Sequence, residues 1–347
     1  MVKTHITDNK EINLRGTVMK STIIKRRMLF LLVCTLLVFS CTKKQTEEIK
    51  QPQKNIIVGF SQIGAESAWR TCNTQSMQDA ASASGIQLLY DNAEQKQENQ
   101  IKAIRSFIVY QVDVIVFVPI VQDGWDNVLR EAKDAGIPVI IIDRKMRVAD
   151  ESLFTAFIGA DHIEEGRNAA RFLLKKFKDE DRNFRILEIL GTEGSSVADG
   201  RYAGFREIIN TDNRFTITAS IDGDFLRSRG KEIAETYLQE NPELPFDILF
   251  SHNDGMALGF IDVLNNTSIR PGKDIVIVSV DAEQAAIDAL KEGKINCVVE
   301  CNPKIGDLVI DMVKKLTEGK SIPRTTNISE NVFTEWDDLS LLPLRGY

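Results

Sequence analysis

The chain has 347 residues, of which 43% are hydrophobic and 27% charged, a composition typical of a folded protein with room for two domains. The formal net charge is −7. Without the first 40 residues, which are basic, 36 Lys and Arg face 48 Asp and Glu, a net charge of −12. Such an acidic body repels a phosphate backbone, so we expect no nucleic-acid partner.

The first 40 residues are typical of a signal peptide. Lys25, Arg26 and Arg27 precede an apolar stretch at 28–39 that is too short to span a bilayer. The following Val-Phe-Ser-Cys at 38–41 resembles the lipobox of bacterial lipoproteins, in which the cysteine is acylated. We therefore predict a lipoprotein signal peptide over 1–40, lipidation of Cys41, and anchoring to a bacterial membrane in the periplasm or cell envelope. The alternative is an ordinary signal peptide with an incidental cysteine.

Residues 41–54 form a polar segment, "CTKKQTEEIKQPQK", which predicts a flexible tether. From residue 55 onward, short apolar runs alternate with amphipathic stretches of helical period. The runs predict ten strands, at 56–60, 86–90, 114–118, 139–142, 155–158, 185–190, 215–219, 248–250, 275–280 and 295–299.

Many of these runs are apolar on both faces, as in parallel strands that helices cover on each side. Ten strands are too many for one five- or six-stranded sheet. The sequence therefore predicts an α/β fold with two similar doubly wound parallel-sheet lobes.

Polar and aromatic side chains follow several of the predicted strands. Ligands of doubly wound sheets bind beyond the carboxyl ends of the strands, so these positions are the candidate site. They carry carboxylate, amide and guanidinium groups beside one indole, a set that suits a small polyhydroxylated molecule. The segments are 64–70, 143–144, 191–201, 251–254 and position 281.

Each of these residues also has a simpler interpretation. Trp69 is equally well explained as a core or surface aromatic, and Asp143 with Arg144 as a local ion pair. Asn253 and Asp281 are residue types that commonly cap helices, as are Glu66 and Ser67 at the start of a predicted helix. What favours a ligand site is that all of them occur at the same end of successive strands.

Signals of catalysis and of metal binding are weak. The sequence has no G-x-G-x-x-G after the first strand, no P-loop and no G-x-S-x-G elbow. With no Cys-x-x-Cys pair and three histidines, nothing resembles a zinc site, and we expect no metal or cofactor. Cys72, Cys297 and Cys301 are predicted to be small core residues.

Several motifs occur in an order that resembles a known family. These are "VGFSQIGAESAWR" at 58–70, "EQKQENQIKAIRSFI" at 94–108, "GWDNVLREAKDAGIPV" at 124–139, "IDR" at 142–144, "GDFLRSRGKEI" at 223–233 and "HNDGMALG" at 252–259. The chain resembles the periplasmic sugar-binding proteins of the ribose/galactose type that serve ABC importers, over about residues 55–345. "AESAWR" and "QKQENQIKA" are specific to the galactofuranose-binding branch.

The resemblance implies two lobes of periplasmic binding protein type I, joined by a three-segment hinge. The N-terminal lobe would comprise 55–159 and 302–330, and the C-terminal lobe 160–301 and 331–347. A galactofuranose- or galactose-like monosaccharide would be captured between them by hinge closure. By the same resemblance, the sugar contacts would be Glu66, Ser67, Trp69, Arg70, Asp143, Arg144, Arg201, Asn253 and Asp281.

The resemblance also implies a binding protein rather than an enzyme, monomeric, with a membrane permease as its partner. The alternative is a sugar-sensing receptor that serves a chemotaxis or kinase partner. At three positions the chain departs from the branch. Gly200 stands where a side chain that contacts sugar is expected, Asp199 is displaced by one position, and Gly255 replaces a usual acid.

Overall fold

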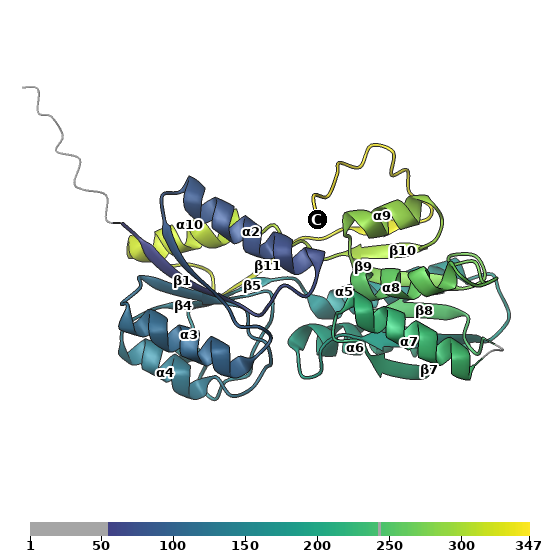
Figure 1. Cartoon of the computed structure of the whole chain (residues 1–347), viewed down its shortest axis with the longest axis horizontal. Helices are drawn as coiled ribbons and strands as arrows, with labels where there is room; N and C mark the ends of the chain where they lie inside the picture. The colour runs from purple at the N-terminus through teal and green to yellow at the C-terminus, as the bar shows by residue number, and fades with distance from the viewer. Residues whose placement is uncertain (1–54, 242–243) are drawn as a thin grey trace, which may run out of the picture. The chain divides into compact units, whose positions relative to one another are not determined.

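The computed structural model describes residues 55–241 and 244–347. The predicted signal peptide, the tether and Cys41 lie outside these residues. The described part contains two six-stranded sheets, A and B, each covered by helices on both faces (Figure 1). Across the described ranges, no helix combines the length and the apolar character needed to cross a membrane.

Sheet A has the strand order β11-β5-β4-β3-β1-β2, and all its pairings are parallel. Helices α2 and α10 cover one face, and α3 and α4 cover the other (Figure 1). The strands are β1 Ile57–Gln62, β2 Gln87–Asn92, β3 Val114–Phe117, β4 Val139–Ile142, β5 Ala156–Gly159 and β11 Thr325–Asn327. The helices are α2 Ala68–Ala83, α3 Gln97–Val109, α4 Asp126–Asp134 and α10 Gly306–Thr317, with a short 3-10 turn at Glu151–Leu153.

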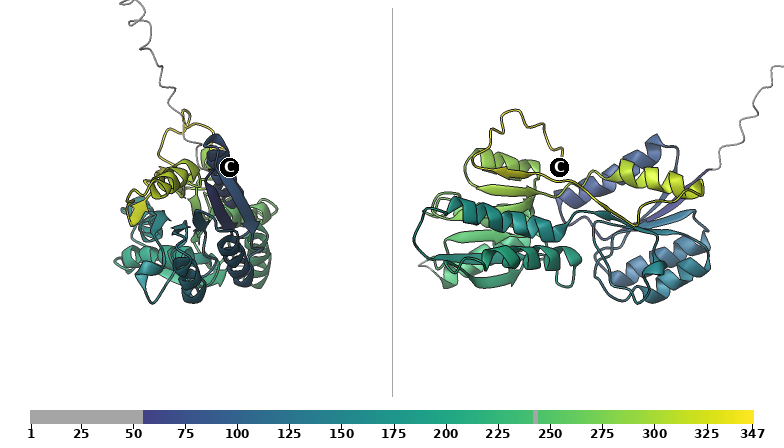
Figure 2. Two further views of the ribbon diagram at one scale, coloured as in Figure 1. Left: turned by 90° about the vertical axis from the view of Figure 1, so that its left-hand side faces the viewer. Right: turned by 180° about the vertical axis from the view of Figure 1, so that it is seen from behind.

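Sheet B has the order β12-β10-β9-β8-β6-β7, parallel except for the antiparallel pair β10–β12. Helices α5 and α6 cover one face, seen in front in the right-hand view of Figure 2, and α7, α8 and α9 cover the other. The strands are β6 Phe184–Leu190, β7 Phe215–Asp222, β8 Ile248–Ser251, β9 Val276–Asp281, β10 Cys297–Glu300 and β12 Val332–Thr334. The helices are α5 His162–Lys176, α6 Ser196–Ile209, α7 Arg227–Glu240, α8 Asp254–Leu264 and α9 Gln284–Lys291.

The two sheets have the same strand order, with β6 to β10 taking the places of β1 to β5. This confirms the prediction of two similar doubly wound lobes, and all ten predicted strands are present. The sequence analysis missed β11 and β12. Each has three residues, too few for an apolar run to stand out from its surroundings.

The chain passes between the sheets three times, as predicted. The passages run from β5 to α5, from β10 to α10, and from β11 to β12. The carboxyl ends of β5 and β10 are therefore the points where the chain leaves one lobe for the other. Residues near these ends, far apart in sequence, are brought together.

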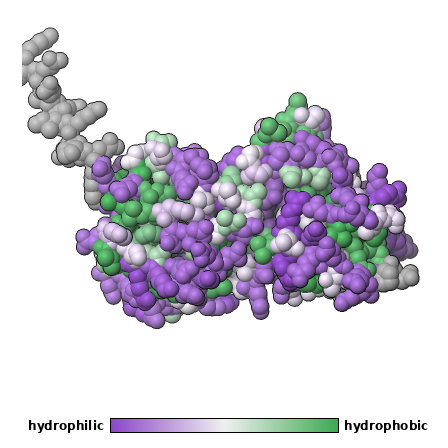
Figure 3. Space-filling view, viewed as in Figure 1, coloured by the Kyte–Doolittle hydropathy of each residue, from purple (hydrophilic) through white to green (hydrophobic). Residues whose placement is uncertain are grey.

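Each lobe has its own apolar core. One core cluster fills both faces of sheet A, and two clusters fill the faces of sheet B. Cys297 and Cys301 are buried as predicted, whereas Cys72 on α2 is half-buried. The face drawn in Figure 3 is mostly hydrophilic, in keeping with the acidic composition.

Helices α5 and α6 approach closely because glycines lie between them. A Cβ on Gly204 would lie 1.9 Å from the backbone oxygen of Ile163, and one on Gly166 would lie 2.2 Å from that of Arg201. Any side chain there would push the helices apart. This close approach sets the Arg201 side chain against the first turn of α5.

Candidate functional site

All nine side chains proposed from the sequence line one pocket, together with Val197, Phe225 and Cys301. They come from the carboxyl ends of strands in both sheets. The space left between the side chains is narrow, about 30 Å³. The structure thus brings together residues spread over more than two hundred positions.

The loop between β1 and α2 supplies Glu66 and Ser67, and the first turn of α2 supplies Trp69 and Arg70. Ser67 is the N-cap of α2, and its hydroxyl accepts a hydrogen bond from the backbone N–H of Arg70 at 3.1 Å. The Arg70 guanidinium donates through Nε to Glu66 Oε1 at 2.9 Å and pairs through Nη2 with Asp143 Oδ2 at 2.7 Å. Asp143 therefore pairs with a residue of another strand end, which ties the β1 and β4 ends together.

Trp69 projects from α2 toward the second lobe. Its indole Nε1 donates to the backbone oxygen of Cys301 at 2.5 Å, and its ring packs with core residues of sheet B. The guanidinium carbon of Arg70 lies 4.6 Å from the ring centroid, within cation–π range. Trp69 is 6% exposed, so it serves the lobe-to-lobe contact and the pocket wall together.

Arg201 forms the corresponding set of ion pairs in the second lobe. Its Nε donates to Glu165 Oε2 at 2.7 Å and its Nη2 to Asp281 Oδ1 at 3.2 Å, while Nη1 donates to the backbone oxygen of His252. The guanidinium is 2% exposed. Two carboxylates thus balance its charge, as two balance that of Arg70.

Asn253 has a structural role beside its place in the pocket. It is the N-cap of α8, accepting from the backbone N–H of Met256 at 2.9 Å, and its Nδ2 donates to the backbone oxygen of Phe225 at 3.1 Å. The capping interpretation is therefore confirmed for Asn253 and for Ser67. Both residues nevertheless line the pocket, so capping and lining are not exclusive.

Three pocket residues have left-handed backbone conformations. Asp143 has φ +64°, Phe225 has φ +60° and Asp281 has φ +125°. Non-glycine residues adopt such conformations at a cost, and they persist where the surroundings impose them, often at functional sites. The backbone here is held so that these side chains reach the pocket.

The ionisable side chains of the pocket shift one another's pKa values, and together they provide both hydrogen-bond donors and acceptors. Burial favours a low pKa for Arg70, but Asp143 and Glu66 outweigh it and raise the pKa. Burial and the neighbouring Arg70 lower the pKa of Arg144 to about 10, which leaves it protonated at neutral pH. Burial raises the pKa of Asp281 well above its ordinary value, against the pull of Arg201, which lowers it.

Several buried polar atoms of the pocket residues are unpaired. Within the described ranges, Glu66 Oε2, Arg70 Nη1 and Arg144 Nε have no hydrogen-bond partner. Arg144 uses Nη1 to donate to the backbone oxygen of Ile120 at 2.9 Å. Unpaired buried polar groups are costly, so these atoms are available to a ligand.

The sequence analysis missed Phe225, Val197 and Cys301. Phe225 follows β7, and the guanidinium carbons of Arg144 and Arg201 lie 5.5 Å and 5.8 Å from its ring centroid. Phe225 belongs to the motif "GDFLRSRGKEI" and follows a predicted strand, so its position in the sequence could have identified it as a candidate pocket residue. Cys301 follows the last predicted strand and looked like a core residue.

Gly200, which stands where the resemblance suggests a sugar-contacting side chain, does not line the pocket. A Cβ at this position would lie 2.8 Å from the Cβ of His162 on α5, so Gly200 belongs to the contact between α5 and α6. A side chain there would meet α5 rather than a ligand. A Cβ on Gly255, by contrast, would make only ordinary contact with the Asn253 amide, 3.5 Å away.

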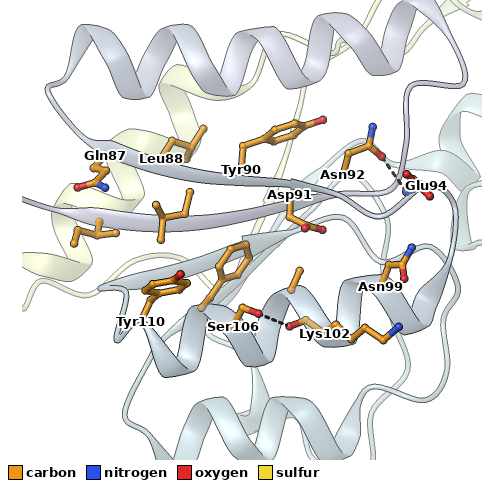
Figure 4. A pocket seen from close by; sticks show the side chains of 14 residues that line it. Gln87, Leu88, Tyr90, Asp91, Asn92, Glu94, Asn99, Lys102, Ser106 and Tyr110 are labelled. Atoms are coloured by element: carbon orange, nitrogen blue, oxygen red, sulfur yellow. Dashed lines mark hydrogen bonds between the residues drawn. The ribbon is translucent and has the colours of Figure 1, made fainter.

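A larger groove lies between β2 and α3, at the outer edge of sheet A (Figure 4). Its volume is about 800 Å³, and its lining belongs to a single lobe, between positions 57 and 110. None of the nine proposed residues lines it. The groove therefore does not account for their convergence, and the narrower pocket is the candidate site.

Comparison with known proteins assigns the chain to a family. Residues 58–321 match the family model described as a periplasmic binding protein domain. The chain is 38% identical over 277 residues to the galactofuranose-binding protein YtfQ of Escherichia coli, which covers 80% of this chain and 86% of that protein.

Solved structures support the same family assignment. A Mycobacterium smegmatis protein in complex with β-D-fucofuranose is 42% identical, with a TM-score of 0.78 over 81% of this chain and 91% of that one. The periplasmic binding protein of the arabinose ABC transporter from Shewanella sp. ANA-3, bound to α- and β-L-arabinofuranose, is 41% identical, with a TM-score of 0.77 over 80% and 92%. The chain therefore belongs to the periplasmic binding protein family, in the sugar-binding group of the ribose and galactofuranose type, whose members bind substrates and are not enzymes.

Proposed function

We propose that this protein captures a monosaccharide, a furanose resembling galactofuranose or galactose, between its two lobes and presents it to the permease of an ABC importer. The observation that carries the proposal is the pocket itself. Nine side chains chosen for sugar chemistry, from both lobes, surround one small space.

The choice of a furanose rests on the relatives. YtfQ is named for galactofuranose, and the two solved structures contain fucofuranose and arabinofuranose. All three are between 38% and 42% identical to this chain.

The unpaired atoms suit sugar hydroxyls. Arg70 Nη1 and Arg144 Nε are free to donate, and Glu66 Oε2 is free to accept. Hydrogen bonds to charged groups contribute about 1.5–3 kcal/mol each, so three of them supply much of a micromolar binding free energy of about −8 kcal/mol. Trp69 and Phe225 add apolar faces for the C–H groups of a sugar ring.

Capture requires the lobes to open and close. A space of about 30 Å³ holds a water molecule or two but not a monosaccharide. Hydrogen bonds join the two lobes, among them Trp69 Nε1 to Cys301 O at 2.5 Å and Gln122 Nε2 to Asp199 Oδ2 at 2.6 Å, and they support the proposal that this arrangement is the closed one. Hinge motion at the three passages would separate lobe 55–159 with 302–330 from lobe 160–301 with 331–347.

The signal sequence supports a cell-envelope location with a lipid on Cys41, on a monomeric protein. Mass spectrometry of the protein purified from membranes should show an acylated N-terminal Cys41. A Cys41→Ser variant should lose the lipid and leave the membrane fraction. An unmodified wild-type N-terminus would contradict the lipid anchor but not sugar binding.

Thermal unfolding in the presence of candidate sugars tests the ligand. A ligand that binds only the folded state raises the melting temperature, and galactofuranose-containing sugars, galactose, arabinose, ribose and glucose are the set to compare. We expect the largest rise with a sugar that adopts a furanose ring. No rise with any of them would contradict the proposal.

The partner is a separate question. A permease and an ATPase encoded beside the gene would support import. A neighbouring chemoreceptor or sensor kinase would favour the alternative, a sugar-sensing receptor.

A further inference from the structure

Three buried side chains with different ligand atoms meet at the wall of the pocket, which Cys301 itself lines. His162 and Glu165 lie in the first turn of α5, three residues apart and therefore on one side of the helix. Cys301 follows β10, against which α5 packs. One ligand atom from each of the three lies within 4.8 Å of the other two. His162 and Glu165 begin the helix that follows the passage from β5 to α5, and Cys301 lies at the start of the passage from β10 to α10.

One polar atom of this cluster lacks a partner. Within the part of the chain that the structure describes, His162 Nε2 makes no hydrogen bond, whereas the Glu165 carboxylate also interacts with the Cys301 thiol and with the Glu330 carboxyl, whose pKa burial and Glu165 together raise to about 10. His162 is 4% exposed and Glu165 is 2% exposed, so water does not readily replace the missing partner. The nearest ion-pair contact of His162 Nε2 is with Asp143 Oδ1, at 3.8 Å, beyond hydrogen-bond range. Leaving buried polar atoms in this state is costly unless something binds them.

A neighbouring residue fixes the orientation of the glutamate. Arg201 Nε donates to Glu165 Oε2 at 2.7 Å, so Oε1 is the oxygen that Arg201 does not occupy. Hydrogen bonds of this kind commonly orient ligand side chains around metal ions. The charge of Arg201 is also balanced by Asp281 at 3.2 Å, so the guanidinium does not leave a net positive charge beside the cluster.

We propose that His162, Glu165 and Cys301 form a binding site for a divalent transition-metal ion, with Zn²⁺ as the expected occupant. Imidazole, carboxylate and thiolate are the ligands that Zn²⁺ accepts, at about 2.0–2.3 Å. Donor atoms around a tetrahedral zinc lie about 3.5 Å apart, so the three side chains need to draw together by about 1 Å. A fourth position remains for a water molecule.

Binding changes one bond of the protein. The S–H bond of Cys301 breaks, a sulfur–metal bond forms, and the proton passes to the solvent buffer. His162 binds through the lone pair of Nε2, and Glu165 through Oε1. No oxidant or reductant is needed.

Cobalt provides a direct spectroscopic test, because Co²⁺ occupies zinc sites and reports a bound thiolate. The mature protein is treated with a chelator, dialysed, and titrated with CoCl₂ and then with ZnCl₂. We expect one equivalent of Co²⁺ to produce a sulfur-to-cobalt charge-transfer band in the near ultraviolet, and one equivalent of Zn²⁺ to abolish it. A wild-type protein without this band would overturn the proposal.

Variants locate the site. Cys301→Ser should remove the charge-transfer band, and His162→Asn should weaken cobalt binding at least about tenfold. Cys297→Ser is the matched control, since Cys297 is a buried free thiol at the start of the same strand, and Cys72→Ser controls for the half-buried thiol. Both controls should keep the band.

Two further results would overturn the site. One is a band that persists in Cys301→Ser, and the other is a cobalt affinity unchanged in His162→Asn. If Cys301→Ser does not fold, as judged by circular dichroism, the His162→Asn titration decides by itself.

Discussion

At the scale of single residues, two buried arginines organise the pocket, one in each lobe. Arg70 holds Glu66 and Asp143, and Arg201 holds Glu165 and Asp281. Removing a charge from water is costly, and a buried guanidinium is tolerated here because two carboxylates compensate it. The polar atoms that remain free to bind a ligand, such as Glu66 Oε2 and Arg70 Nη1, are those that have no partner in these ion pairs.

Trp69 is the first residue to test. Trp69→Ala removes an aromatic face and the hydrogen bond to Cys301, so we expect sugar affinity measured by calorimetry to fall at least about tenfold, or about 1.4 kcal/mol. Trp336→Ala is the control, because Trp336 is 46% exposed and contacts Phe172 rather than the pocket. Equal affinities of Trp69→Ala and the wild type would place the sugar elsewhere.

Arg144 is the second residue to test. Its Nε is unpaired and buried, so Arg144→Ala deletes a donor available to a ligand, together with the Nη1 hydrogen bond to Ile120, and affinity should again fall at least about tenfold. The matched control is Arg147→Ala three residues later, where an exposed arginine pairs with Asp123. Titration calorimetry in which both variants bind alike would rule out a direct role for Arg144.

At the scale of elements, the N-terminus of α2 is completed by the opposite lobe. Ser67 caps the backbone N–H of Arg70, whereas the backbone N–H of Trp69 donates to Glu283 Oε1 at 3.2 Å. Glu283 precedes α9 in the second lobe, where Asp254 Oδ2 accepts from its backbone N–H at 2.7 Å. A carboxylate at a helix N-terminus is favourable, so Glu283 of the second lobe completes the cap of α2.

This cap makes a prediction about lobe closure. Glu283→Ala removes the acceptor that only the closed arrangement supplies, so we expect a more open protein and a sugar affinity several-fold weaker. Small-angle scattering without sugar should show a larger radius of gyration than for the wild type. Glu292→Ala, in an exposed pair with Lys294 just after the same helix, should change neither quantity. Unchanged scattering and affinity in Glu283→Ala would show that this bond does not bias closure.

At the scale of the whole molecule, buried acids couple stability to pH. Asp254 on α8 is fully buried, and burial together with Glu283 raises its pKa well above the ordinary value. The folded state therefore keeps a proton that the unfolded chain releases near pH 3.9. The contribution of Asp254 to stability is fully present below about pH 4 and is lost as the pH rises toward its folded-state pKa.

The variant Asp254→Asn should remove this dependence. We expect the free energy of unfolding, measured with urea between pH 5 and 8, to fall less steeply with pH than in the wild type, by up to about 1.4 kcal/mol per pH unit. Asp262→Asn is the control on the same helix, since Asp262 is 45% exposed and pairs with Arg227 at the surface. Parallel slopes for the wild type and Asp254→Asn would contradict a buried, protonated Asp254.

The sequence by itself determined the alternation of strands and helices, the two similar lobes, and the residues at the strand ends. These follow from local periodicity and from the rule that parallel strands present their carboxyl ends at one edge. Glu66, Ser67, Trp69 and Arg70 could be named because they directly follow β1. The resemblance to a known family then selected among the strand-end candidates in the second lobe.

Only the tertiary structure decided which distant groups meet. Phe225 and Cys301 reach the pocket, Gly200 faces α5, and Glu283 completes a helix in the other lobe. The histidine, glutamate and cysteine of the proposed metal site have no metal-binding spacing in the chain, so the absence of a familiar zinc motif says nothing about them. The physical reason is that three passages between the sheets bring strand ends together, and no local pattern records which side chains then face each other.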